Sequence, residues 1–217
     1  QGEGTLVGVP SAFVRISGCN LRCSWCDTPY ASWNPEGPVL QVDEIVRQVE
    51  GFGIRHVVVT GGEPMLFEPI VDLTQKLAAG GHHLTIETAG TVFREVACDL
   101  MSISPKLANS TPSDPAWRER HEATRSDLAP LRQLIARHPY QLKFVVNPEA
   151  DTGDLAEIEA LLIAIDADRS KVLLMAEGTD SETLHRHQRL LAPICMSTGF
   201  RLTPRLHVDL FGNTKGT

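Results

Sequence analysis

The sequence lacks an apolar run long enough to cross a lipid bilayer, and it shows no secretory signal pattern at its start. It also lacks internal repeats and low-complexity tracts, so its 217 residues predict a single domain over 1–217. An excess of positive charge is missing too: the net charge is -7, which argues against nucleic acid as a partner. We therefore expect a cytoplasmic protein that binds neither membranes nor nucleic acid.

Cysteine is scarce, and the odd total of five argues against structural disulfides. Three cysteines are clustered with C-x3-C-x2-C spacing as Cys19, Cys23 and Cys26, and no fourth cysteine lies near them. A closed zinc site needs four ligands, whereas three thiolates can hold a 4Fe–4S cluster and leave one iron open. A partial zinc site or a redox pair remains the alternative. Cys98 and Cys195 stand apart and are predicted to be small core residues.

Apolar strand patterns alternate with helical patterns along the chain. The strand patterns cover 11–16, 56–60, 83–87, 100–104, 141–146 and 171–176. Helical spacing of apolar residues covers 42–49, 70–77, 128–137, 155–165 and 182–191. This alternation predicts an α/β fold with a parallel sheet covered by helices, either open or barrel-like. The polar stretch 108–125 fits neither pattern, and we expect it to be the least structured part, as a lid or an insertion.

Polar and glycine-rich groups follow the ends of several of these strand patterns. They are the cysteine cluster, Gly61-Gly62-Glu63, Glu87-Thr88 and Ser104-Pro105-Lys106. In parallel α/β folds the carboxyl ends of the strands meet at one edge, where binding and catalytic groups collect. Glycine has no Cβ, so we expect the backbone at Gly61-Gly62 to approach a ligand closely.

The cysteine spacing, joined to Gly61-Gly62-Glu63-Pro64 after a strand, resembles the radical S-adenosylmethionine (radical SAM) enzymes. That resemblance implies an incomplete TIM-like barrel and a 4Fe–4S cluster on the three cysteines, with S-adenosylmethionine (SAM) on the open iron. It also implies that one electron from the cluster cleaves SAM to a 5′-deoxyadenosyl radical. A flavodoxin- or ferredoxin-type reductant would be the partner that supplies this electron.

A narrower resemblance is to the family of 7-carboxy-7-deazaguanine synthases of queuosine biosynthesis. The segments that carry it are 1–4, 13–15, 26–28, 87–91, 104–106, 206–207 and 211–213. It implies ring contraction of 6-carboxy-5,6,7,8-tetrahydropterin to 7-carboxy-7-deazaguanine with loss of ammonia, in a homodimer that uses Mg²⁺. The chain begins with Gln1 inside one of these motifs, so what precedes it is left open.

Carried over by position, this resemblance assigns roles to individual residues. The expected pterin contacts are Gln1, Gly2, Arg15 and Thr60. The expected SAM contacts are Trp25, Asp27, Gly62, Ser104, Lys106, Met175, Ala176 and Glu177, and Thr28 would ligate magnesium.

The residue types suit these roles. Arg15 can pair bidentately with a carboxylate, although it could also be a capped strand end. The Thr28 hydroxyl suits magnesium, but it could instead satisfy the loop backbone. Glu87 ends an apolar strand, where an acid is costly without a partner. His207 is a candidate for proton transfer, although a lone histidine is more often structural.

Two other functions compete with this hypothesis. A glycyl-radical-enzyme activase is also a small radical SAM protein, but it would not need the arginine, threonine and glutamate set for a pterin. An iron–sulfur electron carrier or structural metal module is the non-enzymatic alternative. The glycine motif beside three cysteines argues against it.

Overall fold

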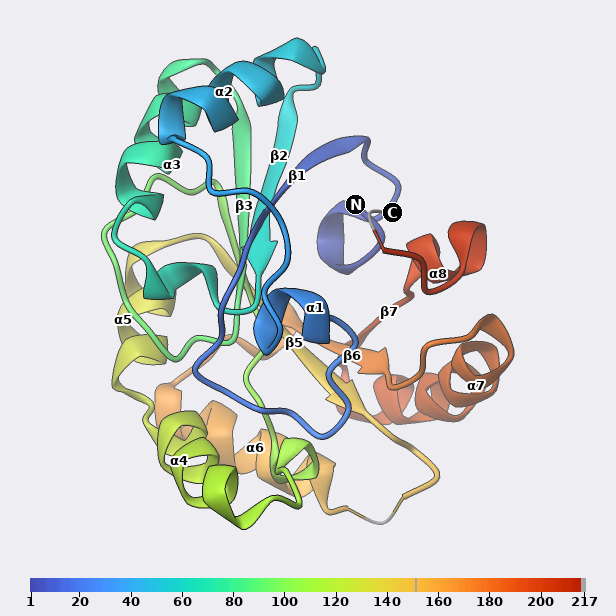
Figure 1. The fold of residues 1–217 in the computed structure, drawn as a ribbon. Coiled ribbons are helices and arrows are strands. Elements are labelled where there is room, and N and C mark those ends of the chain that lie inside the picture. Colours follow the sequence, from blue (N-terminus) through green and yellow to red (C-terminus); the bar gives the residue numbers. More distant parts are fainter. Residues whose placement is uncertain (151, 216–217) are drawn as a thin grey trace.

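The computed structural model describes residues 1–150 and 152–215. Seven parallel strands form one sheet in the order β1-β2-β3-β4-β5-β6-β7. Their bounds are β1 Ser11–Ile16, β2 His56–Gly61, β3 His83–Thr88, β4 Leu100–Ile103, β5 Tyr140–Val146, β6 Val172–Ala176 and β7 Arg201–Thr203. Spatial neighbours are also neighbours in sequence, and the curved sheet is the partial barrel expected above (Figure 1).

Most of the helices cover the outer face of this sheet (Figure 1). The helices are α1 Pro29–Ser32, α2 Val42–Gly51, α3 Ile70–Ala79, α4 Pro115–Ser126, α5 Ala129–Arg137, α6 Asp154–Ile165, α7 Ser181–Thr198 and α8 Leu206–Phe211. Short 3₁₀ turns are η1 Gly4–Leu6, η2 Pro64–Leu66, η3 Ala108–Ser110 and η4 Arg169–Lys171. Among the described helices, none combines the length and the apolar character that a membrane span requires.

The burial of the strands reflects their place in the sheet. Central strand β2 is buried at four consecutive positions, 57–60, as expected for a strand covered on both faces. Edge strand β1 alternates: Ala12 and Val14 are buried in the core, while Phe13 and Arg15 are exposed. The alternation places Arg15 on the open side of the barrel, away from the helical layer.

The expectation that 108–125 is the least structured part is wrong, because it contains η3 and most of α4. Asp114 caps α4 by accepting a hydrogen bond from the Ala116 N–H at 2.9 Å. Only His121 of this helix is buried, so no apolar period marks it in the sequence. Whether the segment acts as a lid stays a prediction.

Strand β7 and helix α8 were not predicted, because three and six residues are too few to show a period. They return the chain to the N-terminal loop. Gly2 C=O accepts a hydrogen bond from the Leu206 N–H at 2.9 Å, and the Gly4 N–H donates to Thr203 Oγ1 at 2.7 Å. The N-terminal loop and α8 therefore lie together across the open side of the barrel (Figure 1).

Candidate active site

A cavity of about 870 Å³ opens at the carboxyl ends of the strands. This volume lies toward the upper end for small-molecule sites and leaves room for two ligands side by side. Each of β1 to β6 contributes lining residues, and the segment after β7 adds Arg205 and His207. The predicted residues that line it are Gln1, Gly2, Arg15, Cys19, Cys23, Trp25, Cys26, Asp27, Thr28, Thr60, Gly62, Glu87, Ser104, Lys106, Met175 and His207.

Two residues expected at the SAM site do not line this cavity. Ala176 is 1% exposed and packs into the hydrophobic core. The Glu177 N–H donates to Val146 C=O at 3.0 Å, and its own C=O contacts His187 Nδ1 at 2.7 Å. Of the three residues predicted at the end of β6, only Met175 faces the cavity, because alternation turns its neighbour to the other side of the sheet.

The cysteine loop follows β1 and presents all three of its thiols to the cavity. Burial raises the pKa of Cys23 to about 12 and also raises the pKa of Cys19. In the part of the chain that the structure describes, no three His, Cys, Asp or Glu side chains converge on one metal ion. A cubane takes each thiolate on a different iron, so it does not need the three sulfurs to meet at one point as a single zinc ion does.

The glycine motif at the end of β2 lines the cavity, and its glycines also have a structural role. A Cβ on Gly61 would lie 1.8 Å from Ile16 C=O, and a Cβ on Gly62 would lie 2.3 Å from Gly18 C=O. The Gly62 N–H and the Glu63 N–H donate to these same two carbonyls, at 3.1 and 2.9 Å. The missing Cβ atoms thus let the start of the cysteine loop pack directly on the end of β2, which fixes where the first thiol lies.

Glu63 joins the ends of two strands. Its side chain is fully buried and accepts hydrogen bonds from Thr88 Oγ1 at 2.8 Å, the Ala89 N–H at 2.8 Å and the Met65 N–H at 3.1 Å. Burial raises the pKa of Glu63 despite these donors. Glu63 therefore ties the end of β2 to the end of β3 at the rim of the cavity.

On the cysteine-loop side, Trp25 and Lys106 form one polar-aromatic corner. The Trp25 indole N–H donates to Asn109 Oδ1 at 3.2 Å, and the Asn109 amide donates to Val145 C=O at 3.1 Å and Asp154 Oδ2 at 2.9 Å. Lys106 Nζ lies 5.4 Å from the centre of the Trp25 ring and donates to Ser104 Oγ at 2.8 Å. The predicted SAM contacts Trp25, Ser104 and Lys106 are therefore brought together.

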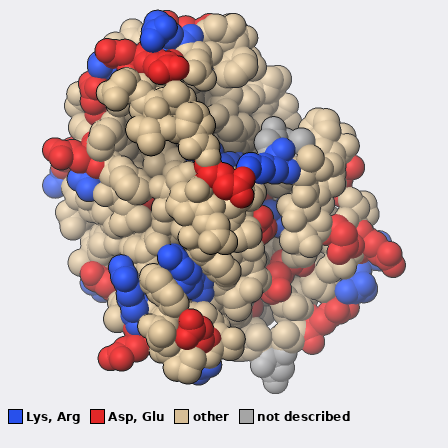
Figure 2. All heavy atoms as spheres, in the orientation of Figure 1, with Lys and Arg blue, Asp and Glu red and all other residues tan. Residues whose placement is uncertain are grey.

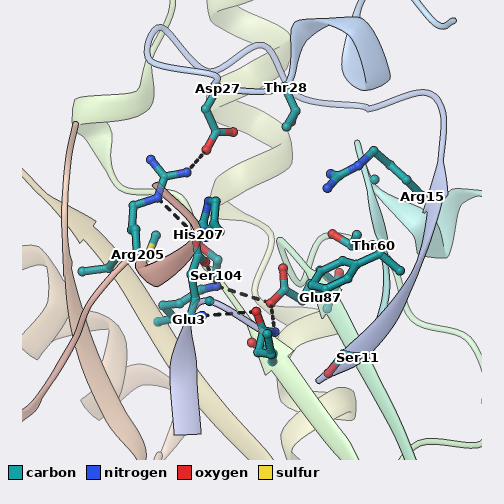
Figure 3. A pocket seen from close by; sticks show the side chains of 18 of the residues that line it. Glu3, Ser11, Arg15, Asp27, Thr28, Thr60, Glu87, Ser104, Arg205 and His207 are labelled. Carbon is teal, nitrogen blue, oxygen red and sulfur yellow. Dashed lines mark hydrogen bonds and ion pairs between the residues drawn. The ribbon is translucent and has the colours of Figure 1, made fainter. Parts of the chain in front are cut away.

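Arg15 and Thr28 face the cavity with their polar groups available (Figure 3). Within residues 1–150 and 152–215, the Arg15 guanidinium has no hydrogen bond or ion pair, and its recorded contact is the Tyr30 ring at 6.0 Å. Thr28 occupies the N-cap of α1 but gives it no side-chain cap bond. In the described part of the chain, Arg15 does not cap the end of its strand, and the Thr28 hydroxyl does not bond to the loop backbone. Neither structural alternative for these two residues is therefore observed.

A network of buried charges forms the opposite wall (Figure 3). Lys143, 3% exposed, pairs with Glu3 and lies 3.6 Å from Glu87 Oε1. Arg205 Nε donates to Glu3 Oε1 at 3.1 Å, and Arg205 also pairs with Asp27. Burial alone would raise the pKa of Glu3, but Lys143 and Arg205 lower it below its usual range. Burial would lower the pKa of Lys143, and the two carboxylates raise it instead.

His207 sits against the N-terminal loop. A Cβ on Gly2 would lie 2.3 Å from His207 Nδ1, so only glycine allows this contact. Burial lowers the pKa of His207. The imidazole is therefore neutral near pH 7, when its unprotonated ring nitrogen can accept a proton.

Three residues of this site were missed from the sequence: Glu3, Lys143 and Arg205. Lys143 interrupts the apolar run 141–146, which is the same signal that singled out Arg15 and Glu87. A lysine inside a strand buried on both faces needs a charged partner. Its partner Glu3 lies 140 residues away, and sequence spacing could not pair them.

Comparisons with known proteins agree with this geometry. The family model described as the radical SAM superfamily matches residues 13–109, from β1 through the cysteine loop and the glycine motif to Asn109. A 7-carboxy-7-deazaguanine synthase of Halobacterium salinarum is 45% identical to this chain, and the alignment covers 100% of this chain and 89% of that synthase. A 7-carboxy-7-deazaguanine synthase of Rhodopirellula baltica is 42% identical, and the alignment covers 100% of this chain and 85% of that synthase.

Solved structures point the same way. The crystal structure of QueE from Escherichia coli has a TM-score of 0.70 at 25% identity, over 95% of this chain and 90% of that chain. Streptococcus suis SuiB bound to S-adenosylmethionine has a TM-score of 0.56 at 12% identity, over 89% of this chain and 49% of that chain. The second likeness shows a shared fold alone.

Proposed function

The chain belongs to the 7-carboxy-7-deazaguanine synthases of the radical SAM superfamily, and we propose that its cavity binds SAM beside a carboxylated tetrahydropterin. The reaction is the ring contraction of 6-carboxy-5,6,7,8-tetrahydropterin to 7-carboxy-7-deazaguanine with loss of ammonia. The observation that carries the substrate assignment is the Arg15 guanidinium, which has no ion-pair partner among the described residues and faces a cavity whose far wall carries the half-buried carboxylates Glu3 and Glu87. This arrangement complements a molecule with a carboxylate at one end and N–H donors at the other.

The cysteine-loop side of the cavity suits the cofactors. Cys19, Cys23 and Cys26 would hold a 4Fe–4S cluster, and Trp25, Gly62, Ser104, Lys106 and Met175 would line the SAM pocket. When bound, the cluster and SAM supply the radical that starts the reaction.

The part of the cavity between Arg15 and the charged wall of Glu3, Lys143 and Arg205 suits the pterin. Arg15 would bind its carboxylate with two parallel hydrogen bonds. Glu3 and Glu87 would accept hydrogen bonds from the N–H groups of the ring, and Gln1 Nε2, which donates to Glu87 Oε1 at 2.8 Å, would help to orient them. Lys143 and Arg205 lower the pKa of Glu3 and so keep it ionised. His207, held neutral by burial, is the group that would move a proton as ammonia leaves.

The finer expectations are part of this proposal. The free Thr28 hydroxyl would join the substrate oxygens around Mg²⁺. All five cysteines are free thiols, which supports a reducing, cytoplasmic setting. A homodimer and a flavodoxin- or ferredoxin-type reductant complete the expected partners. The similarity to the synthases over the whole chain favours this function over a glycyl-radical-enzyme activase or an electron carrier.

The function is tested by reconstituting the cluster without oxygen and supplying SAM, dithionite, Mg²⁺ and 6-carboxytetrahydropterin. Mass analysis should find 7-carboxy-7-deazaguanine and 5′-deoxyadenosine. Formation of 5′-deoxyadenosine alone, with the pterin intact, would overturn the substrate assignment while leaving radical SAM chemistry in place.

Arg15→Lys is expected to weaken pterin binding by about 10-fold to 100-fold. A charge-assisted hydrogen bond contributes roughly 1.5 to 3 kcal/mol, and lysine replaces a planar fork with a point charge. Calorimetry of pterin binding measures the effect. Uncoupled 5′-deoxyadenosine formation is the internal control and should not change. Equal pterin affinity in both proteins would make Arg15 a structural residue.

Thr28→Ala is expected to remove most of the magnesium stimulation of turnover, whereas Thr28→Ser should keep it. A single neutral oxygen is a weak ligand, so magnesium should bind well only when the substrate adds its own oxygens. Turnover against magnesium concentration, with and without the pterin in binding assays, gives the comparison. Tight magnesium binding to the substrate-free protein that survives in Thr28→Ala would rule out this role.

A further inference from the structure

Two arginines and a tryptophan form a stack on the outside of the cysteine loop. The Arg22 guanidinium lies over the Trp117 ring at 4.0 Å from its centre, and the Arg120 guanidinium lies over the same ring at 5.0 Å. Arg120 is exposed, while Arg22 and Trp117 are half-buried. Tryptophan and arginine are the residue types most enriched at the energetic centres of protein interfaces, and stacking holds these side chains in place before a partner arrives.

The stack is attached directly to the loop that carries the thiols. Arg22 lies between Cys19 and Cys23 in sequence, and its Nη1 donates to Cys19 C=O at 2.9 Å and to Leu21 C=O at 2.8 Å. The Arg22 backbone N–H donates to Nδ1 of the buried His121 at 3.1 Å. Since His121 belongs to α4, the helix and the loop form one unit, with the cavity on its inner side and the stack on its outer side.

The positive charges of the two stacked arginines are not neutralised by salt bridges within the described residues. Across the residues that the structure describes, neither Arg22 nor Arg120 forms a salt bridge, whereas Arg125 of the same helix pairs with Glu122 and Glu157. Glu119 lies about 200° around the helix from Trp117, so it faces elsewhere. Figure 2 shows basic side chains with acidic ones among them in the region of α4, whereas acidic side chains predominate over α7.

We propose that the Arg22–Trp117–Arg120 stack is the docking surface of an acidic one-electron carrier protein. The proposal rests on the proposed function, which needs one electron delivered to a cluster on this loop. In the step, the carrier is oxidised by one electron and the cluster is reduced by one; no bond forms or breaks and no proton moves. Charge complementarity favours this partner, because an unpaired basic patch on a protein of net charge -7 attracts an acidic surface and orients it.

The test measures binding, so that it does not depend on turnover. Oxidised flavodoxin, and in a second series oxidised plant-type ferredoxin, is titrated into the cluster-loaded protein by calorimetry at low and moderate salt. Arg120→Glu is the main variant, since this side chain contacts Trp117 and is not among the residues that line the cavity. Arg189→Glu is the matched control, because it makes the same charge change at an exposed arginine of α7.

Arg120→Glu should raise the dissociation constant of at least one carrier about tenfold and flatten its salt dependence, while Arg189→Glu should change it less than about twofold. Trp117→Ala should weaken binding in the same direction, with circular dichroism to confirm that the helix remains. Equal effects of the two charge reversals, or none from Arg120→Glu, would overturn the docking proposal. Product formation by the unmodified protein with dithionite reports separately on the proposed function, since dithionite needs no docking surface.

Discussion

Cys23→Ser is expected to abolish assembly of the 4Fe–4S cluster and, with it, SAM cleavage. The three clustered thiols are the soft donors that line the cavity, and a cubane that leaves one iron open to SAM has no ligand to spare. Serine is nearly isosteric but its oxygen is a poor ligand for iron–sulfur clusters. Iron and sulfide analysis, together with the electron paramagnetic resonance signal of the reduced protein, measures the loss. Cys19→Ser and Cys26→Ser should behave alike.

Cys195→Ser is the matched control for this prediction. Cys195 and Cys23 are each 8% exposed, so both changes place a hydroxyl in a buried thiol position. Cys195 lies in α7, away from the cavity, and packs in the hydrophobic core. The Cys195→Ser change should lower the stability of the protein somewhat and leave the cluster intact, and Cys98→Ser should do the same. Loss of the cluster in Cys195→Ser, or full activity with zinc in place of iron, would contradict the assignment.

Regular elements with a clear apolar period could be predicted from the sequence. The runs at β2 and β3 and the helical spacing at α3 and α5 are visible because burial on one or both faces repeats at 2 or 3.6 residues. Helix α4 could not be found in this way, because His121 is its only buried residue. It forms nonetheless with a cap at Asp114 and with the hydrogen bond that His121 Nδ1 accepts from the Arg22 N–H of the cysteine loop.

The same limit applies to the site. Groups that follow strand ends could be placed at one edge, because parallel topology brings those ends together whatever the loops between them do. Residues whose role depends on a partner far away in the sequence could not be assigned to the site from the sequence. Arg205 links Glu3 to Asp27 across most of the chain, and only the folded barrel brings these three side chains together. The glycine motif shows a third case: its place was predictable, but its reason, close packing of β2 on the cysteine loop, was not.

Lys143→Met is expected to lower the free energy of unfolding by about 3 to 5 kcal/mol, which is the range for removing one partner of a buried ion pair. Methionine fills a similar volume, so the loss reports on charge and not on a cavity. Glu3 would keep Arg205 as a partner, while Glu87 would keep only the Gln1 amide. The free energy comes from anaerobic urea unfolding of the cluster-free protein, followed by circular dichroism.

Lys76→Met is the control, because Lys76 also lies between two carboxylates, Asp43 at 2.6 Å and Asp72 at 2.9 Å, but on the surface. Solvent screens that pair, so its removal should change stability far less. Glu3→Gln combined with Lys143→Met should recover part of the loss, because the double change removes charge from both sides of the buried pair. A similar cost for the two lysine variants would show that burial of Lys143 does not matter.

The pH dependence gives the sign of this effect independently. In the unmodified protein the pKa of Glu3 is lowered, so its contribution to stability is present above about pH 4.3, the unfolded value, and is lost as pH falls through the folded pKa. Lys143→Met removes a positive charge from beside Glu3 and Glu87, and protonation of a carboxylate relieves the repulsion that remains. The stability difference between the two proteins should therefore shrink as pH falls from 7 toward 4. A difference that stays constant over this range would mean that Lys143 acts through packing and not through its charge.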